Sequence, residues 1–429
     1  MIETIEIKPV EGPIHATVRP PGSKSITNRA LVCTALAEGQ SILSGALDSE
    51  DTRVMIDALR ALGVSIQVDD GGRTLRVEGC NGWIPAPRAA LFVGNSGTTM
   101  RFLTALATLG HGEFRLDGVP RMRQRPIGDL IAALTQLGAS LACEGANNCP
   151  PVVVRADGLA GGRASIRGDI SSQFLSGLLM AAPYAGRDVQ LAVDGTLVSI
   201  PYVEMTLRVM EAFGAAASKA ADYSVIAVSN AHHYEGRQYT IEPDASAASY
   251  FFAAAAITGG RITVEGLSRE SLQGDVAFCD CLQQMGAKAE FGADSITVES
   301  GSLRGVDVDM NAISDTVQTL AVVALFAEGP TRIRNVAHIR HKETDRIGAT
   351  ATELRKLGAR VTEFDDGLHI EPGPLRGAAI DTYDDHRMAM SFALAGLRTA
   401  NVVIRDPACT GKTYPEFFRD LDRAVRTPS

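Results

Sequence analysis

The feature that most constrains this chain is an amphipathic helix that recurs at a nearly constant interval along its 429 residues. Each copy ends in a glycine followed by a small residue, as in Ala-Leu-Arg-Ala-Leu-Gly-Val and Glu-Leu-Arg-Lys-Leu-Gly-Ala. The five glycines are Gly63, Gly138, Gly214, Gly286 and Gly358. Their intervals lie between 72 and 76 residues, which a chance set of α/β helices would not keep. We therefore expect one structural unit repeated along the chain.

A second element keeps the same period. An apolar, alanine-rich helix runs towards a glycine or alanine and a short strand, in the segments 31–39, 102–112, 174–186, 250–260, 317–329 and 388–400. We expect left-handed glycine caps at these helix ends, because a side chain would be strained there. A sixth copy of the first helix is expected at residues 417–421. Each unit is then helix, strand, turn, helix and strand, with further strands such as 74–77 and 295–298.

Six units of about 70 residues divide into three plus three, and a chain of this length is expected to form two domains. Residues 235–244 mark the expected crossing between the halves. A solenoid is the alternative, but its repeats are usually shorter. The apolar alternation in residues 3–9 predicts a strand that closes the chain back on itself.

Composition excludes several classes of function. The net charge of −9 argues against nonspecific nucleic-acid binding, although a local basic cluster could still bind small anions. The seven cysteines include no C-x-x-C pair, and the histidines have no metal-ligand spacing, so we expect a reducing compartment and no structural metal. We expect neither a signal peptide nor a transmembrane span, and hence a cytoplasmic protein without a nucleic-acid or membrane partner.

In the first half of the chain, polar residues gather where the repeated helices begin. One helix opens with Pro-Gly-Ser-Lys-Ser-Ile-Thr-Asn-Arg, residues 21–29, and the next with Gly-Asn-Ser-Gly-Thr, residues 94–98. Residues 121–126 contain three arginines before a proline, and residues 171–173 and 199–202 supply further hydroxyls. Helix beginnings attract anions, so phosphate or carboxylate binding is one interpretation of these motifs. Ordinary helix capping and solvated basic side chains remain the alternative for each motif taken alone.

The helix beginnings of the second half also carry acids. Asp315 is expected to begin an otherwise apolar helix, while residues 342–346, 384–387 and 410–413 place charged groups at three further expected helix starts. The Asp244 segment is expected to be only an N-cap. Surface ion pairs could explain any one of these motifs. Burying all the cations together without anionic ligands would be costly, so their recurrence favours one binding site.

These motifs resemble the 5-enolpyruvylshikimate-3-phosphate (EPSP) synthase family. The likeness covers residues 20 to about 418 and rests on the motifs at 21–29, 94–98, 125–128, 342–346 and 385–390. It implies an inside-out α/β barrel fold with two domains, each built from three βαβαββ-type repeats. One domain would comprise residues 1–20 and 242–429 with Asp315, Glu343, Arg346, Arg387 and Lys412. The other, residues 21–241, would carry Lys24, Arg29, Arg125 and Ser171, with the active site in the interdomain cleft.

The resemblance also implies the two substrates, shikimate 3-phosphate and phosphoenolpyruvate (PEP), bound in that order. Shikimate 3-phosphate would be held by Lys24, Ser25, Arg29, Ser171, Ser172, Gln173, Ser199, Tyr202, Asp315 and Lys342. PEP would be held by Lys24, Asn95, Gly97, Arg125, Gln173, Arg346, Arg387 and Lys412. The family further implies Asp315 as the base at the substrate hydroxyl and Glu343 as the acid and base at C3 of PEP. Lys24 would assist and His386 would line the site, in a monomer that needs no metal or organic cofactor.

Some positions depart from the commonest forms of the family. Phe102 stands where many members have proline, Ser96 and Thr99 where they have alanine, and His338 where asparagine is frequent. We place Phe102 at the beginning of the helix behind Gly97. We expect it to alter how tightly glyphosate, an inhibitor that resembles PEP, fits beside that glycine.

Two alternatives remain. The related UDP-N-acetylglucosamine enolpyruvyl transferases use a cysteine in the loop that corresponds to residues 119–125, and this chain has none there. A non-catalytic anion-binding protein on the same scaffold would keep the arginines but would not need Asp315 and Glu343.

Overall fold

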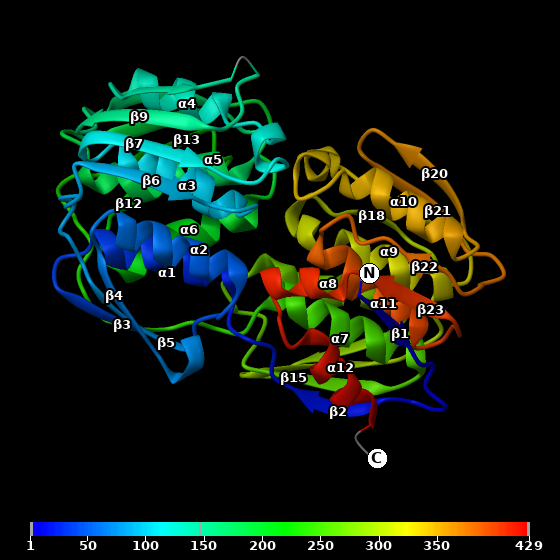
Figure 1. The fold of residues 1–429 in the computed structure, drawn as a ribbon. Helices are drawn as coiled ribbons and strands as arrows, with labels where there is room; N and C mark the ends of the chain where they lie inside the picture. The colour runs from blue at the N-terminus through cyan, green and yellow to red at the C-terminus, as the bar shows by residue number, and fades with distance from the viewer. Residues whose placement is uncertain (1–2, 146, 427–429) are drawn as a thin grey trace. The chain divides into compact units, whose positions relative to one another are not determined.

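The structure, a computed structural model, describes residues 3–145 and 147–426. The chain divides into two compact units. Unit 1 comprises Met1–Pro21 and Glu242–Ser429, and unit 2 comprises Gly22–Ile241. Both are mixed α/β, and Figure 1 shows unit 2 in blue to green and most of unit 1 in green to red.

Unit 2 alternates helices with short strands. Its α-helices are α1 (Lys24–Leu36), α2 (Glu50–Ala61), α3 (Gly97–Ala107), α4 (Gly128–Gln136), α5 (Ser172–Ala181) and α6 (Ile200–Ala212). Its 3₁₀ helices are η1 (Asp70–Gly72), η2 (Met122–Gln124) and η3 (Ala182–Tyr184). Its strands are β3 (Gln40–Ser44), β4 (Ser65–Asp69), β5 (Thr74–Glu78), β6 (Arg88–Phe92), β7 (His111–Asp117), β8 (Ser140–Cys143), β9 (Val152–Asp157), β10 (Gly162–Arg167), β11 (Val189–Asp194), β12 (Ala217–Lys219), β13 (Val225–Val228) and β14 (Gln238–Thr240).

The strands of unit 2 form four-stranded sheets that share one pattern. Their orders are β14-β3-β5-β4, β6-β7-β9-β8 and β10-β11-β13-β12. In each sheet the first pair is parallel and the other two pairs are antiparallel. A parallel pair cannot be joined by a tight hairpin, and accordingly α3 lies between β6 and β7 and α5 lies between β10 and β11.

Unit 1 is built from the same kinds of element. Its α-helices are α7 (Ala245–Thr258), α8 (Phe278–Met285), α9 (Val317–Val323), α10 (Arg346–Lys356), α11 (His386–Gly396) and α12 (Phe417–Arg426). Its 3₁₀ helices are η4 (Gly274–Ala277), η5 (Asn311–Thr316), η6 (Ala324–Phe326), η7 (Ala337–His341) and η8 (Pro407–Lys412). Its strands are β1 (Thr4–Ile7), β2 (His15–Val18), β15 (Arg261–Glu265), β16 (Lys288–Phe291), β17 (Ser295–Glu299), β18 (Asp307–Asp309), β19 (Thr331–Arg334), β20 (Arg360–Phe364), β21 (Gly367–Glu371), β22 (Ala379–Ile380) and β23 (Val402–Arg405).

Two sheets of unit 1, β2-β15-β17-β16 and β18-β19-β21-β20, repeat the pattern of unit 2. The third, β1-β23-β22, has three strands. Its edge strand β1 pairs antiparallel with β23, with Thr4 opposite Arg405. The predicted N-terminal strand is therefore confirmed, and it does close the chain back on its far end.

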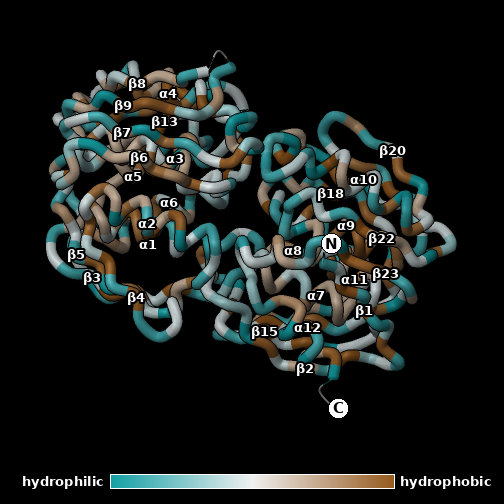
Figure 2. The backbone as a smooth tube through the Cα atoms, in the orientation of Figure 1, coloured by the Kyte–Doolittle hydropathy of each residue, from teal (hydrophilic) through white to brown (hydrophobic). Residues whose placement is uncertain are grey.

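Three helices form the interior of each unit. In unit 2, α1, α3 and α5 pack against one another, and in unit 1 so do α7, α9 and α11. Every residue of α7 is buried, which is typical of a helix enclosed on all sides. The strands alternate buried and exposed residues, for example along β3 and β15, so one face of each of their sheets covers apolar side chains. Figure 2 shows hydrophobic stretches along strands such as β9.

Glycine caps account for most of the repeated helix ends. Gly63, Gly138, Gly214, Gly286 and Gly358 all have φ between 93° and 110°, as predicted. The prediction was wrong for the glycines of the second set: Gly186 and Gly260 have no left-handed φ, and Gly39, Gly112 and Gly329 lie two to four residues beyond the caps of α1, α3 and η6. Gly259, with φ 81°, caps α7 instead, and a 3₁₀ turn follows α5. The expected helix near residue 417 is confirmed as α12.

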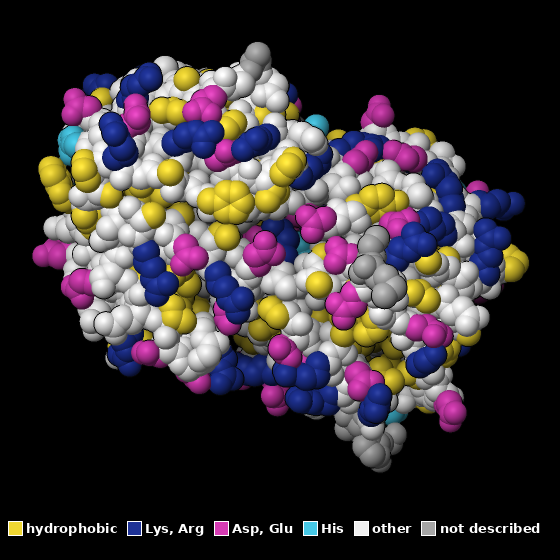
Figure 3. All heavy atoms as spheres, in the orientation of Figure 1, with side chains coloured by type: hydrophobic (Ala, Val, Ile, Leu, Met, Phe, Trp, Pro, Cys, Tyr) yellow, Lys and Arg dark blue, Asp and Glu magenta, His cyan; other side chains and the backbone are white. Residues whose placement is uncertain are grey.

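The described residues have a mixed-charge surface and free cysteines. Figure 3 shows basic and acidic side chains interspersed on the visible face, and many form exposed ion pairs such as Arg53 with Asp48. Every described cysteine is a free thiol. Within residues 3–145 and 147–426, no helix is long and apolar enough to cross a membrane, and no group of His, Cys, Asp and Glu side chains could hold a metal ion.

Candidate active site

The three interior helices of unit 2 all begin at a serine cap. Ser23 caps α1, Ser96 caps α3 and Ser171 caps α5, each side chain accepting a hydrogen bond from a backbone N–H of the first turn. The first helical residues are therefore Lys24, Gly97 and Ser172. Because the first N–H groups of a helix have no intrahelical partner, each of these beginnings carries partial positive charge.

Arg29 lies one turn into α1 and joins several elements of unit 2. Its Nε donates to Thr206 Oγ1 at 2.7 Å, and its Nη2 donates to Ser176 Oγ at 3.4 Å and to the Tyr202 carbonyl at 3.1 Å. Its Nη1 donates to the Ser25 carbonyl at 2.9 Å. Neutral oxygens thus fill most of its donor positions, and burial lowers the pKa of Arg29 to about 10.

A second group of predicted residues meets around the beginning of α3. Arg125 Nη1 donates to the Asn95 carbonyl at 2.9 Å and to Asn95 Oδ1 at 3.3 Å. A Cβ added at Gly97 would lie 2.5 Å from Arg125 Nη2 and 3.0 Å from Gln173 Oε1. Gly97, Arg125 and Gln173 therefore lie side by side, and only a glycine at position 97 leaves room for the guanidinium.

The arginine run of residues 121–126 contains the 3₁₀ helix η2, and α4 begins two residues after Pro126, at Gly128. Arg123 is exposed and pairs with Asp117 at 2.7 Å, as expected of a solvated basic residue. Arg125 is the residue of this run that becomes buried beside Asn95.

The remaining predicted residues of unit 2 stand at helix beginnings. Lys24 is nearly buried, and its Nζ lies 3.5 Å from Asp51 Oδ2, an acid that the sequence analysis did not select. Ser199 precedes α6 with a left-handed φ of 54°, and Tyr202 follows in its first turn. Asn28 donates to Thr98 Oγ1 at 2.8 Å, which joins the first turns of α1 and α3.

In unit 1, Arg346 is the centre of a buried ionic cluster at the beginning of α10. Its Nε donates to Asp385 Oδ2 at 2.8 Å and its Nη2 to Asp385 Oδ1 at 3.2 Å. Its Nη2 also lies 2.9 Å from Glu343 Oε2, one turn earlier in the chain. Burial works against the charged form of Arg346, but the surrounding carboxylates of Asp385, Glu343 and Asp315 together raise its pKa.

Asp315 connects three cations of unit 1. Its Oδ1 pairs with Lys342 Nζ and lies 3.1 Å from Arg346 Nη1, and its Oδ2 lies 2.7 Å from Arg387 Nη2. Asp315 comes from η5, Lys342 from the end of η7, and Arg387 from the start of α11. Four of the predicted residues of this unit, with Glu343 as the fifth, therefore form one continuous network.

The electrostatic surroundings lower two further pKa values in this cluster. Burial lowers the pKa of Lys342, and the positive charges of Arg346 and Arg387 act in the same direction. Burial, helped by the charge of Lys342, lowers the pKa of His338 to about 3. His338 is therefore uncharged at neutral pH.

His386 and Lys412 are also buried in unit 1. His386 is the first residue of α11 and its Nδ1 lies 3.7 Å from Asp385 Oδ1. Lys412 ends η8, which packs against α11. The prediction that residues 410–413 start a helix was wrong, since they end a 3₁₀ helix and α12 begins at Phe417. The prediction that Asp244 is an N-cap is confirmed, because it accepts from the Ala247 N–H at 2.9 Å.

Asp385 is the most important residue that the sequence analysis left out of its candidate site. Besides holding Arg346, its Oδ1 accepts from the Arg387 N–H at 2.9 Å and so caps α11. It is completely buried. An acid directly before His-Arg at a helix start was a usable signal. No local signal marks Thr206 and Ser176, which bond Arg29 from other helices.

We had expected Phe102 to begin a helix, and this prediction was wrong. It is the sixth residue of α3 and is fully buried. Its ring centroid lies 5.3 Å from the guanidinium carbon of Arg29. Any influence of Phe102 on the space beside Gly97 would therefore pass through the packing of α3 and Arg29.

Comparisons with known proteins agree over nearly the whole chain. A family model described as EPSP synthase (3-phosphoshikimate 1-carboxyvinyltransferase) matches residues 9–421. A 3-phosphoshikimate 1-carboxyvinyltransferase from Nostoc punctiforme is 51% identical over 419 residues, which cover 97% of this chain and 98% of that protein. A chloroplastic 3-phosphoshikimate 1-carboxyvinyltransferase from Nicotiana tabacum is 48% identical, covering 98% of this chain and 84% of that protein.

Solved structures give the same assignment. The structure of EPSP synthase from Acinetobacter baumannii matches with a TM-score of 0.81 at 27% identity, covering 98% of each chain. The fold, the family match and the identity with full-length relatives are mutually consistent. The chain therefore belongs to the EPSP synthase (3-phosphoshikimate 1-carboxyvinyltransferase) family.

Proposed function

We propose that the buried clusters described above perform the reaction of this family, with the residue roles given below. The reaction transfers the enolpyruvyl (carboxyvinyl) group of PEP to the 5-hydroxyl of shikimate 3-phosphate and releases phosphate. This is a step of the shikimate pathway to chorismate and the aromatic amino acids. Family membership and the relatives at about 50% identity support an enzyme of this activity and do not favour the two alternatives.

The observation that carries the proposed roles is the ionic network around Arg346. Its cations, Arg346, Arg387 and Lys342, are matched by the carboxylates of Asp315, Glu343 and Asp385. A purely anion-binding site would need the cations, but it would have no use for two further acids beside the helix cap Asp385. A site that binds anionic substrates and also transfers protons needs both the cations and these two acids.

PEP is assigned to the cations and to the space beside Gly97. Its phosphate and carboxylate groups are bidentate acceptors that suit arginine. In our proposal Arg125 and Gln173 bind it from unit 2, with Lys24, Asn95 and the Gly97 backbone, and Arg346, Arg387 and Lys412 bind it from unit 1. The close approach of Arg125 to Gly97 supports this assignment, because it brings a guanidinium to the beginning of α3, where helix N–H groups favour an anion.

Shikimate 3-phosphate is assigned to the hydroxyls and cations of helix beginnings in unit 2, together with Asp315 and Lys342. Ser171, Ser172 and Gln173 open α5, and Ser199 and Tyr202 lie at the start of α6. Lys24 and Ser25 open α1. Arg29 already donates to four protein oxygens, so we propose that it contributes at most one further hydrogen bond and mainly holds these helices in place.

Asp315 is proposed as the base that takes the proton of the 5-hydroxyl while the hydroxyl oxygen attacks C2 of PEP. Glu343 gives a proton to C3, which yields a tetrahedral ketal phosphate. Phosphate then leaves and Glu343 takes a proton back from C3, while Lys24 assists and His386 lines the site. Correctly placed acids and bases of this kind contribute about 10²–10⁴-fold each.

The cations have a second part in this mechanism. Arg346 and Arg387 contact Asp315, and Arg346 contacts Glu343. The phosphate and carboxylate of PEP would compete for the same donors. We propose that substrate binding draws the guanidinium groups towards PEP, which leaves the two carboxylates better able to accept protons.

The finer architecture belongs to the same proposal. Residues 1–20 with 242–429 and residues 21–241 are taken as two domains of an inside-out α/β barrel fold, each with three βαβαββ-type repeats and with the active site in the cleft between them. The shared strand order of the four-stranded sheets supports the repeats. Small-angle X-ray scattering with and without both substrates would test for a cleft that closes, and an unchanged radius of gyration would argue against it.

We also propose a cytoplasmic monomer, which the free thiols of the described cysteines support. Sedimentation at several concentrations would test the monomer, and fractionation of the producing cell would test the compartment.

The activity itself is tested by phosphate release. Shikimate 3-phosphate with PEP should release phosphate, while UDP-N-acetylglucosamine with PEP should not. Release with the second acceptor alone would overturn the assignment in favour of the related transferases, and release with neither would favour a non-catalytic protein.

A further inference from the structure

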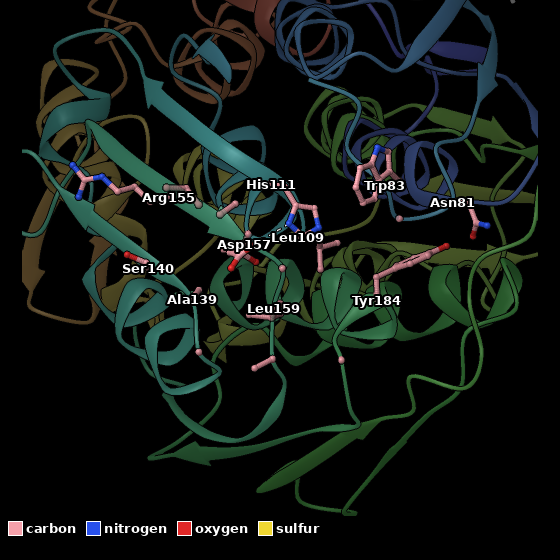
Figure 4. A pocket seen from close by; sticks show the side chains of 18 residues that line it. Asn81, Trp83, Leu109, His111, Ala139, Ser140, Arg155, Asp157, Leu159 and Tyr184 are labelled. Carbon is pink, nitrogen blue, oxygen red and sulfur yellow. Dashed lines mark hydrogen bonds and ion pairs between the residues drawn. The ribbon is translucent and has the colours of Figure 1, made fainter. Parts of the chain in front are cut away.

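Unit 2 contains a cavity of about 610 Å³ where its helices end, shown in Figure 4. Thr108 lines it directly after α3, and Gly138 and Gly186 line it two residues after α4 and η3. The candidate active-site residues stand at the beginnings of these helices, and none of them lines the cavity. Because α3 has 11 residues, its two ends lie about 16 Å apart. The cavity is therefore separate from the site assigned to the two substrates.

Aromatic rings form one part of the cavity wall. Trp83 is 65% exposed, and its ring centroid lies 5.0 Å from that of His111. Tyr184 is fixed, since it stacks on His233 at 4.5 Å and its hydroxyl accepts from the Tyr234 N–H at 3.1 Å. Figure 4 shows Trp83 and His111 close together, with Tyr184 on the same side of the pocket. An exposed tryptophan beside a rigid tyrosine is the kind of wall that binds a ligand rather than the protein core.

The charge at this wall is negative. Asp157 has a fully exposed carboxylate side chain, and its Oδ1 lies 3.2 Å from His111 Nδ1. The carboxyl ends of α3 and α4 add partial negative charge, because the last carbonyls of a helix have no intrahelical partner. Arg155 also lines the cavity, but it lies 3.7 Å from Glu113 and points away from the rings in Figure 4.

We propose that this cavity is a binding site for a small organic cation, with an ammonium or guanidinium group against Trp83 and Asp157. Ring faces attract cations through their quadrupole, and the carboxylate and the helix ends attract the same charge. The apolar residues Leu109 and Leu159, which line the cavity, would contact the body of the ligand. The volume falls within the range of small-molecule sites, about 300–1,000 Å³.

Trp83 provides the test, because it is the only tryptophan of the chain. Its fluorescence would be followed while the whole protein is titrated with choline and, separately, with 3,3-dimethyl-1-butanol, which has the same shape without the charge. We expect a saturable response to choline and at least about fivefold weaker binding of the neutral alcohol. Equal affinity for the two compounds would overturn the proposal in favour of an apolar pocket. A linear, unsaturated response to choline would also overturn it.

Two variants sharpen the test. Asp157→Asn should weaken choline binding about fivefold without changing the response to the neutral alcohol. Asp57→Asn removes the same charge from α2, where neither Asp57 nor its partner Arg60 lines the cavity, so its affinity for choline should equal that of the wild type. Equal losses in both variants would mean a general charge effect and would contradict the site. Phosphate release by both variants would check that they are folded.

Trp83→Phe provides a measurement that does not depend on fluorescence. Calorimetry should still detect choline, because phenylalanine keeps a weaker aromatic face, whereas Trp83→Ala should lose at least about fivefold in affinity. Unchanged affinity in Trp83→Ala would contradict a role for the indole.

Discussion

Arg29 of unit 2 and Arg346 of unit 1 are both only 1% exposed, yet their partners differ in charge. Arg29 donates to hydroxyl and carbonyl oxygens, whereas Arg346 is surrounded by the carboxylates of Asp385, Glu343 and Asp315. Burial accordingly lowers the pKa of Arg29 to about 10, while the carboxylates raise that of Arg346 despite its burial.

The difference suggests distinct tasks for the two clusters. A buried cation that faces neutral oxygens keeps its positive potential for an incoming anion. A cation that shares its charge with several carboxylates stabilises those acids and can change their basicity when it moves. We therefore expect substitutions in unit 2 mainly to weaken the binding of anionic substrates. Substitutions in unit 1 should mainly slow proton transfer.

The largest expected effect is on catalysis in unit 1. Glu343→Gln keeps the size of the side chain but removes its proton-transfer ability, so kcat should fall about 10²–10⁴-fold with the affinity for shikimate 3-phosphate nearly unchanged. Phosphate release and calorimetry would measure the two effects. Glu363→Gln, which changes an acid that bonds Arg340 away from the cluster, should be fully active. Full activity of Glu343→Gln would remove its proposed role.

The second prediction compares how much the partners of Arg346 and Arg29 contribute to the free energy of unfolding. Asp385→Ala leaves the buried Arg346 without its bidentate partner and should lower the free energy of unfolding by about 3–5 kcal/mol. Arg29→Met leaves only neutral groups behind, of which Thr206 and Ser176 already bond each other at 2.8 Å. This substitution should therefore lower the free energy of unfolding by only about 1–3 kcal/mol. Urea unfolding would measure both, and equal losses would break the proposed contrast.

A smaller effect depends on pH. The pKa of His338 falls from 6.5 to about 3 in the folded chain, so between these values the unfolded chain binds a proton that the folded chain does not. Stability from this group should therefore be present above pH 6.5 and fall as the pH drops, by about 1.4 kcal/mol per pH unit. Unfolding free energies of His338→Asn from pH 7 to pH 4.5 should fall less steeply than those of the wild type. The exposed His341→Asn is the control, and parallel curves for His338→Asn would contradict the expectation.

The prediction for unit 2 concerns the binding of PEP beside Gly97. In Gly97→Ala the new methyl group would lie 2.5 Å from Arg125 Nη2 and force the guanidinium to move, so KM for PEP should rise about tenfold. Steady-state kinetics would measure this effect, and the affinity for shikimate 3-phosphate should change less. Gly12→Ala, where a Cβ would meet nothing within 4 Å, is the matched control. An unchanged KM would mean that PEP does not use this space.

The smallest expected effect concerns Phe102. Proline at the sixth residue of α3 would break a helix hydrogen bond, so Phe102→Leu is the better test than the family's proline. We expect a change of only a few-fold in the ratio of the glyphosate inhibition constant to KM for PEP, since the ring acts through Arg29. Inhibition assays would measure it, and an identical ratio would discard the link between Phe102 and glyphosate.

Features that depend on local periodicity could be predicted from the amino-acid sequence. The spacing of Gly63, Gly138 and the later caps predicted the repeat, because a left-handed residue at a helix end demands glycine at that place in the chain. It also placed Lys24, Gly97 and Asp315 at or next to helix beginnings. The roles of these residues came from the resemblance to the family, not from the spacing.

The pairing of the buried polar side chains depends on how distant parts of the chain pack. Thr206 bonds Arg29 across 177 residues, and Asp385 bonds Arg346 across 39, so no local pattern could pair them. Lys412 ends a 3₁₀ helix where the local pattern favoured a helix start, and the cavity beside Trp83 exists because separate helices end together. The physical reason is that helix caps are satisfied within one turn of the chain, whereas buried charges are satisfied by whatever packing brings near them.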